Sequence, residues 1–565
     1  MDQRGEYETW YRQLIALSDR ASDDLLASTT AATQVADAIT VSALPEKARS
    51  VLLFMCSSII LNCAFELKDS SIINQGKELA ERALSGTTPD EPLHYQCQYN
   101  VANAVTNLCD IGLPEAIPGT TRATWEPQLI ENRIETRTDL QEARRRFFEV
   151  GSSATADHRT RSAAFCNLGN ILDHSGRWAE AYDFFLRALE VDPRNGNAAG
   201  NLAQLLHTRI GTGIGQTGHI AAVYDKYVAL AQELREGTLE FAAAAVADRW
   251  DELRPSESEG HLAHGLDDLE AADGEYRRWV AQFRLALSPA VEGLGTDDVR
   301  WDSATIETLY GTTAEEMNPP ILAAMNVLKS DFLVSRRLAF DAQLQLADGL
   351  EQTEDDSGLY VETLDYSLYG IQYSKLLLAQ RSALDVLDKT AVVANEHFGV
   401  GDIPKKVTFR GFWAAKTGQL REPLVKAPGR ALPNIALAEL ASDMEKTGMY
   451  GASQALRNAG THRIVHAALL SATGVTEDSR SRIDLLELMN STVLALQVTR
   501  SAYLYLIDLV AMWNHPDDHQ GTYLPFPGLC YFHDPTAENA IPASGLDPGS
   551  ASIAGSPSTS RSGHG

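Results

Sequence analysis

A two-helix stretch in the first half of this chain constrains its fold most. Residues 163–195 read AAFCNLGNILDHSGRWAEAYDFFLRALEVDPRN. Apolar residues recur at helical spacing on both sides of a tight turn at Ser175 and Gly176, and Pro193 follows the second helix. Small residues stand where the helices would touch: Gly169, Ala181 and Ala188. Larger apolar residues lie between them: Phe165, Leu168, Leu172 and Phe185. The stretch predicts a helical hairpin whose apolar face needs neighbours to cover it.

This pattern resembles the tetratricopeptide repeat, with Phe165 in place of the usual Trp and Leu172 in place of the usual Tyr. Other segments fit neighbouring units, some weakly: residues 76–85, 98–105, 140–151 and 197–206. We therefore expect N-terminal helices at 1–45 and a repeat-like solenoid at 46–245. Such a solenoid offers a concave surface for a peptide or protein partner, or serves only as a structural platform for the second half of the chain.

Helical periodicity continues in the second half of the chain, and strand-like alternation is nearly absent. The pattern predicts long helices at 321–344, 366–400, 431–448, 451–471 and 481–513, with a basic, aromatic connection at 403–430. We expect an all-α protein: the solenoid, a helical connector at 246–315, an antiparallel helix bundle at 316–515, and a loop and disordered tail at 516–565.

Composition narrows the functional classes. No apolar run reaches the roughly 20 residues that span a bilayer, so no membrane partner is expected. The six cysteines form no close pair, which predicts reduced thiols in a cytoplasmic protein. The formal net charge of −28 argues against sequence-blind nucleic-acid binding. Residues 401–470, however, hold ten basic and five acidic side chains, so a locally positive region exists.

A motif in that basic region contains side chains that could catalyse a reaction. In LRNAGTHRIVH, residues 456–466, Arg457 and Asn458 precede His462 on an expected helix, where Asn458 and His462 share one face. The imidazole can move the proton of an RNA 2′-hydroxyl or of a leaving oxygen, and the guanidinium can stabilise the phosphate. No HExxH or carboxylate cluster is present, so neither a metal nor a cofactor is expected. A similar spacing at Arg254 and His261 lies in an acidic loop and is interpreted as chance.

The Arg-Asn-x-x-x-His order late in a helix bundle resembles the HEPN superfamily of ribonucleases. The segments EYRRWVAQFRLALSP, NEHFGV, KKVTFRGFW and ALRNAGTH follow one another as in one HEPN family, the LA-type, whose members also carry N-terminal tetratricopeptide repeats. The resemblance covers residues 160 to 515 approximately. It implies a metal-independent endoribonuclease, acting as a homodimer whose two motif helices form one RNA cleft, and a toxin or antiviral-defence effector that cleaves cellular RNA.

Carried onto this chain, the resemblance assigns catalysis to Arg457 and His462, with Asn458 in support. Side chains expected to help bind RNA are Lys405, Lys406, Arg410, Trp413 and Arg463.

Two alternatives stay open. Ala459, Gly460 and Thr461 fill the motif where family members have helix-favouring residues, and a helical glycine costs up to about 1 kcal/mol relative to alanine. The bundle could therefore be an inactive scaffold whose repeats bind a protein partner. A nucleotidyltransferase-associated HEPN protein is disfavoured, because Ile464 stands where its tyrosine would be.

Overall fold

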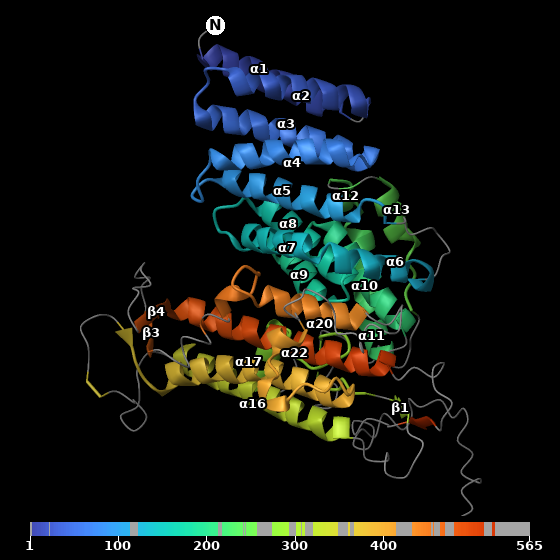
Figure 1. Cartoon of the computed structure of the whole chain (residues 1–565), viewed down its shortest axis with the longest axis vertical. Helices are drawn as coiled ribbons and strands as arrows, with labels where there is room; N and C mark the ends of the chain where they lie inside the picture. The colour runs from blue at the N-terminus through green and yellow to red at the C-terminus, as the bar shows by residue number, and fades with distance from the viewer. Residues whose placement is uncertain are drawn as a thin grey trace, which may run out of the picture.

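Antiparallel helices stack one upon the next from the N-terminus (Figure 1). The computed structural model describes residues 3–21, 23–113, 122–212, 217–240, 242, 244–256, 274–292, 301–306, 308–310, 320–347, 360–361, 367–413, 432–453, 456, 464–468, 480–513 and 523–525. The stack is formed by α1 (Gln3–Ser18), α2 (Leu25–Val41), α3 (Glu46–Leu67), α4 (Ser70–Ser85), α5 (Pro92–Asp110), α6 (Arg122–Glu135), α7 (Arg137–Ser152), α8 (His158–His174), α9 (Trp178–Val191), α10 (Gly196–Thr212), α11 (Thr217–Glu233), α12 (Arg235–Leu239) and α13 (Ala244–Glu252).

The hairpin expected at 163–195 is α8 and α9. The carboxylate of Asp157 caps α8 by accepting a hydrogen bond of 2.9 Å from the backbone N–H of Thr160. Where the two helices touch, a Cβ on Gly169 would lie 2.5 Å from a ring atom of Phe185, so only glycine allows this close approach. Gly176 takes a φ of +76° in the connecting turn, a conformation that glycine adopts at little cost.

The second half of the chain forms a helix bundle below the stack. Its long helices are α16 (Pro320–Ala347), α17 (Ile371–His397), α20 (Leu432–Asp443) and α22 (Leu485–Trp513), with α14 (Gly274–Gln282), η4 (Pro404–Lys406) and α18 (Phe409–Trp413) between or beside them. α22 packs against α16, α17 and α20, and most of its described residues are buried. The all-α fold class, a repeat-like solenoid followed by a helix bundle, is thus confirmed.

Short strands correct the helix assignment around the motif. The prediction of a helix at 451–471 is wrong for its last part, because Ile464–Ala468 forms strand β3. The helices expected from 366 and 481 begin later, at Ile371 and Leu485. The residues before them are β2 (Ser367–Leu368) and β4 (Arg480–Asp484), which pair with β3 antiparallel and parallel respectively. A second small sheet joins β1 (Thr308–Tyr310) to β5 (Tyr523–Pro525).

Two described helices are long and apolar enough to cross a membrane by length and composition alone. The apolar window of α22 is 94% buried inside the protein, which identifies it as the core helix of the bundle. The window of α3 is 56% buried, and this helix packs between α2 and α4 in the stack. Packing within the protein therefore accounts for the apolar character of both.

A buried network of charges joins the stack to the bundle. Arg144 of α7 donates to Glu439 of α20 over 2.9 Å and to Asp443 over 2.8 Å, and all three side chains are fully buried. Arg177, in the turn between α8 and α9, donates to Asp443 and, over 2.7 Å, to Glu180. Burial alone would lower the pKa of Arg177, yet Glu180 and Asp443 raise it well above its ordinary value.

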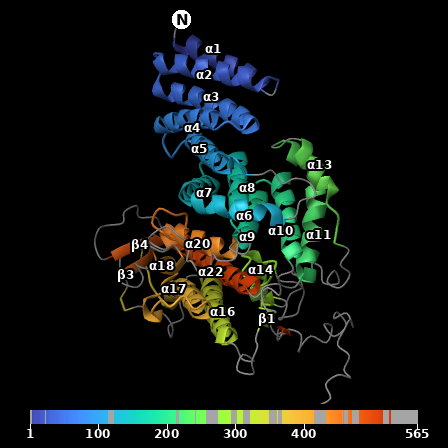
Figure 2. The ribbon, with the colours of Figure 1, turned by 45° about the vertical axis from the view of Figure 1, so that its right-hand side comes forward.

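A second set of buried pairs fixes α22 against α9. Asp508 accepts hydrogen bonds from the indole of Trp178 over 2.7 Å and from Arg209 over 2.6 Å. Asp183 accepts from Arg500 over 2.7 Å and from Arg284 over 2.8 Å. Figure 2 shows α20 and α22 lying against this part of the stack. Because the buried charges of one half are neutralised by the other, the two halves form one body.

Replacing Arg144 with alanine should lower the free energy of unfolding by about 3–5 kcal/mol, because Glu439 and Asp443 would lose a buried cation. Urea denaturation followed by circular dichroism measures it. Arg145→Ala is the matched control: on the same helix, its side chain is 33% exposed and its guanidinium pairs with Glu149 one turn away, so its cost should be about 0–1 kcal/mol. Equal costs for the two variants would contradict the role given to the buried network.

Candidate functional site

The expected catalytic residues fall in a short segment whose two ends are anchored. Arg457, Asn458 and His462, together with Arg463 and Gly460, lie outside the described residues. Leu456 precedes this segment and packs on a cluster that includes Tyr373, Ala467 and Leu488. β3 begins directly after the segment, at Ile464, and contributes Ala467 to the same cluster. Leu456 and β3, which flank the segment, therefore pack on the same apolar cluster.

His466, the last residue of the stretch that holds the motif, lies on a strand. His466 belongs to β3, opposite Arg482 of β4, and therefore does not extend a helix that carries His462. Its ring packs edge-on against Tyr369 at 5.8 Å, and its buried Nε2 has no hydrogen-bond partner among the described residues. This environment is that of a packing histidine. The strand replaces a helix here because Ile464 and Val465 are β-branched and find partners in β4.

Three of the residues expected to bind RNA lie on the bundle surface. Lys405 and Lys406 are exposed in η4, where they add positive charge. Arg410 is half-exposed on α18, and its guanidinium lies 3.8 Å from the carboxylate of Glu445, on the segment between α20 and the motif. A loose, exposed ion pair of this kind contributes little to stability, so Arg410 can exchange its partner for a phosphate.

Trp413, expected from the sequence to help bind RNA, is buried in the bundle, whereas stacking on a base requires an exposed ring. It is 1% exposed and packs at a right angle to Phe412, with ring centroids 4.8 Å apart. A side chain buried to this extent supports the bundle core and offers no face to RNA.

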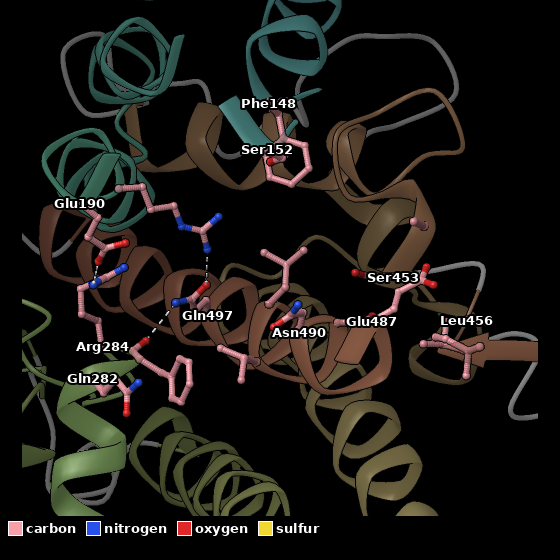
Figure 3. Close-up of a pocket in the computed structure, with 17 residues that line it drawn as sticks. Phe148, Ser152, Glu190, Gln282, Arg284, Ser453, Leu456, Glu487, Asn490 and Gln497 are labelled. Atoms are coloured by element: carbon pink, nitrogen blue, oxygen red, sulfur yellow. Dashed lines mark hydrogen bonds and ion pairs between the residues drawn. The ribbon is translucent and has the colours of Figure 1, made fainter. Parts of the chain in front are cut away.

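A cavity lies between the stack and the bundle (Figure 3). Its volume is about 640 Å³. Its walls come from α7 and α9, from the residues that end and follow α14, from Ala452, Ser453 and Leu456, from Ile483 of β4, and from one face of α22. Leu456, the residue before Arg457, lies in the wall. Sequence reasoning missed this site, because its lining residues come from segments up to about 350 positions apart.

Comparison with family models matches two regions of the chain. Residues 312–512 match the family LA2681-like HEPN, and residues 162–195 match the tetratricopeptide repeat. The comparison thus identifies an LA2681-like HEPN domain at residues 312–512. The matched region includes α16, α17, α20, α22 and the motif segment. Comparison with curated proteins gave no match.

The two matches carry general functional meaning. A HEPN domain indicates a nuclease or other RNA-related role, and HEPN domains are generally ribonucleases. A tetratricopeptide repeat indicates interaction with proteins. In this protein the matched repeat is α8 and α9, the hairpin whose turn supplies Arg177 to the buried network. The repeat and the HEPN domain are thus in direct contact.

Trp413→Ala should lower the free energy of unfolding by about 3–5 kcal/mol, because it leaves a large cavity in the bundle core. Lys405→Ala is the control, and its unfolding should stay within about 0.5 kcal/mol of the parent protein because the residue is exposed. Thermal or urea denaturation of both proteins measures this difference. A Trp413→Ala protein of unchanged stability would contradict the packing role.

Proposed function

We propose that this protein is a metal-independent endoribonuclease whose catalytic pair is Arg457 and His462, with Asn458 in support. The observation that carries the proposal is the Arg-Asn-x-x-x-His sequence inside the region that matches the HEPN family. Three basic side chains of the same domain, Lys405, Lys406 and Arg410, are exposed. They supply local attraction for phosphate in a chain of net charge −28.

The chemistry needs only groups that these residues provide. The 2′-hydroxyl of RNA loses its proton to a base and attacks the adjacent phosphorus. A bond forms between the 2′-oxygen and phosphorus, the bond to the 5′-oxygen breaks, and that oxygen takes up a proton. The imidazole of His462 transfers one of these protons near neutral pH. The guanidinium of Arg457 stabilises the charge that grows on the phosphoryl oxygens, and the amide of Asn458 orients the histidine or the phosphate.

The assembly in this proposal is a homodimer in which two motif segments face one RNA strand. The repeats hold the nuclease in check or receive a protein signal. The buried network supports this coupling, because Tyr450, on the segment that leads to the motif, donates over 2.7 Å to Glu180 of the matched repeat. The biological role proposed is that of a toxin or phage-defence effector in the cytoplasm, which halts growth by cleaving cellular RNA.

A second candidate is a scaffold without catalytic activity. It is favoured by Gly460, which weakens a helix through the motif, and by the acidic composition of the chain. In that case the repeats would bind a protein partner and the HEPN domain would mediate assembly. The two candidates differ in one respect that can be measured: only the first depends on His462.

His462→Ala should abolish RNA fragmentation when the protein is produced in growing cells, with a loss of cleavage of about 100-fold or more. Growth curves and total RNA on a gel, from lysates containing EDTA, measure the effect. His261→Ala is the matched control, because it removes the histidine of the chance Arg254–His261 spacing and should cleave RNA like the parent protein. If parent, control and His462→Ala proteins all accumulate in soluble form and all fragment RNA equally, the assignment of His462 is wrong. If all three leave RNA intact and growth unchanged, the scaffold is favoured.

A further inference from the structure

The cavity between the repeat stack and the HEPN domain has the size and lining of a ligand site. At about 640 Å³ it lies within the range of small-molecule pockets, roughly 300–1,000 Å³. Figure 3 shows Phe148 and Ser152 facing Asn490 and Glu487 of α22 across the open space. The cavity extends from Glu190 and Arg284 at one end to Leu456, the residue before Arg457 in the sequence, at the other.

One guanidinium in the wall lacks a carboxylate partner among the described residues. Arg284 is neutralised by Asp183 at 2.8 Å and Glu190 at 3.1 Å. Arg187, half-buried on α9, makes no ion pair with another described residue. It donates over 2.9 Å to the amide oxygen of Gln497 and lies 5.0 Å from the ring centroid of Phe184. Burial lowers the pKa of Arg187 more than Asp183 raises it, so this cation is left undercompensated and an anion would stabilise it.

The rest of the lining suits an aromatic, hydrogen-bonding ligand. Phe148 and Phe283 provide ring surfaces, and aromatic side chains stack on nucleobases. The amides of Gln282 and Asn490 make no hydrogen bond with other described residues, so both can donate to and accept from a base. Glu487 is exposed at the end near Leu456, away from Arg284, where its carboxylate can accept hydrogen bonds from base amino groups.

We infer that this cavity binds one nucleotide unit, with its phosphate on Arg187 and its base between Phe148 and the Asn490 face of α22. The nucleotide comes from one of two sources. It is a residue of the RNA strand on which the proposed nuclease acts, or it is a free nucleotide that acts as an effector. The RNA source rests on the proposed function, whereas the free-nucleotide source does not.

Binding to full-length protein carrying His462→Ala, which is not expected to cleave, tests the inference. The probes are 5′-AMP and a single-stranded octaribonucleotide, titrated by calorimetry at fixed ionic strength. At least one probe should bind, and Arg187→Gln should weaken its binding by on the order of tenfold or more. Asn490→Glu should weaken it similarly. Because Asn490 is exposed, this second variant keeps the test valid even if loss of Arg187 disturbs folding.

Arg194→Gln is the matched control: this arginine follows α9, is 67% exposed and does not line the cavity, so affinity should be unchanged. Loss confined to the octaribonucleotide assigns the site to the RNA strand, and loss confined to 5′-AMP assigns it to a free nucleotide. Absence of binding by either probe, or unchanged affinity in both cavity variants, overturns the inference. If Arg187→Gln protein with an intact His462 cleaves RNA as well as wild type, the nuclease proposal stands and the RNA source of the nucleotide is ruled out. If 5′-AMP binding depends on Arg187 but the protein never cleaves RNA, the cavity inference stands and the nuclease proposal is wrong.

Discussion

The buried contact between the repeat turn and helix α20 is the constraint on which the rest of this structure depends. Gly176 turns the chain so closely against α20 that a Cβ there would lie 2.7 Å from the side chain of Leu432. The next residue, Arg177, places its guanidinium on Asp443, which also holds Arg144. Separating the two halves would leave these charges buried without partners or would break their ion pairs in water. Either change would raise the free energy of the protein.

This contact gives the repeats a physical route to the motif. α20 ends at Asp443, and the chain then turns and reaches Leu456 within 13 positions. Along the way the backbone N–H of Tyr450 donates to the carbonyl of Asp443, and its hydroxyl donates to Glu180. The lead-in to Arg457 is thus joined to the matched repeat directly through Tyr450 and Glu180, and indirectly through Asp443, which accepts from Arg177. A partner that moves the turn between α8 and α9 would shift that lead-in directly.

The positive charge that could attract RNA is confined to a few places on a chain that is negative overall. A chain of net charge −28 repels RNA over most of its surface. The exposed cations of η4 and α18 are local, and the cations of the seam are almost all neutralised by buried carboxylates. Arg187 makes no ion pair with another described residue; it bonds the amide of Gln497 and packs on the ring of Phe184. If the protein acts on RNA as proposed, attraction limited to such places would keep it from binding RNA everywhere.

Sequence alone determined what rests on local pattern. The period and the sizes of residues in 163–195 were sufficient to predict α8 and α9, and long amphipathic runs were sufficient to predict α16, α17 and α22, because each helix closes its hydrogen bonds within its own segment. The arginine, asparagine and histidine of the motif could also be recognised from sequence, because their spacing is local to one segment.

Only the tertiary structure decided the features whose partners are distant in the sequence. IVHAA at 464–468 became a strand because residues 480–484 pair with it, and a short apolar run does not show such a partner. Arg144 meets Asp443 across 299 positions, and the cavity beside Leu456 exists only because α9 and α22 are brought together. Periodicity records which face of an element is apolar, whereas ion pairs and cavities depend on which elements finally meet.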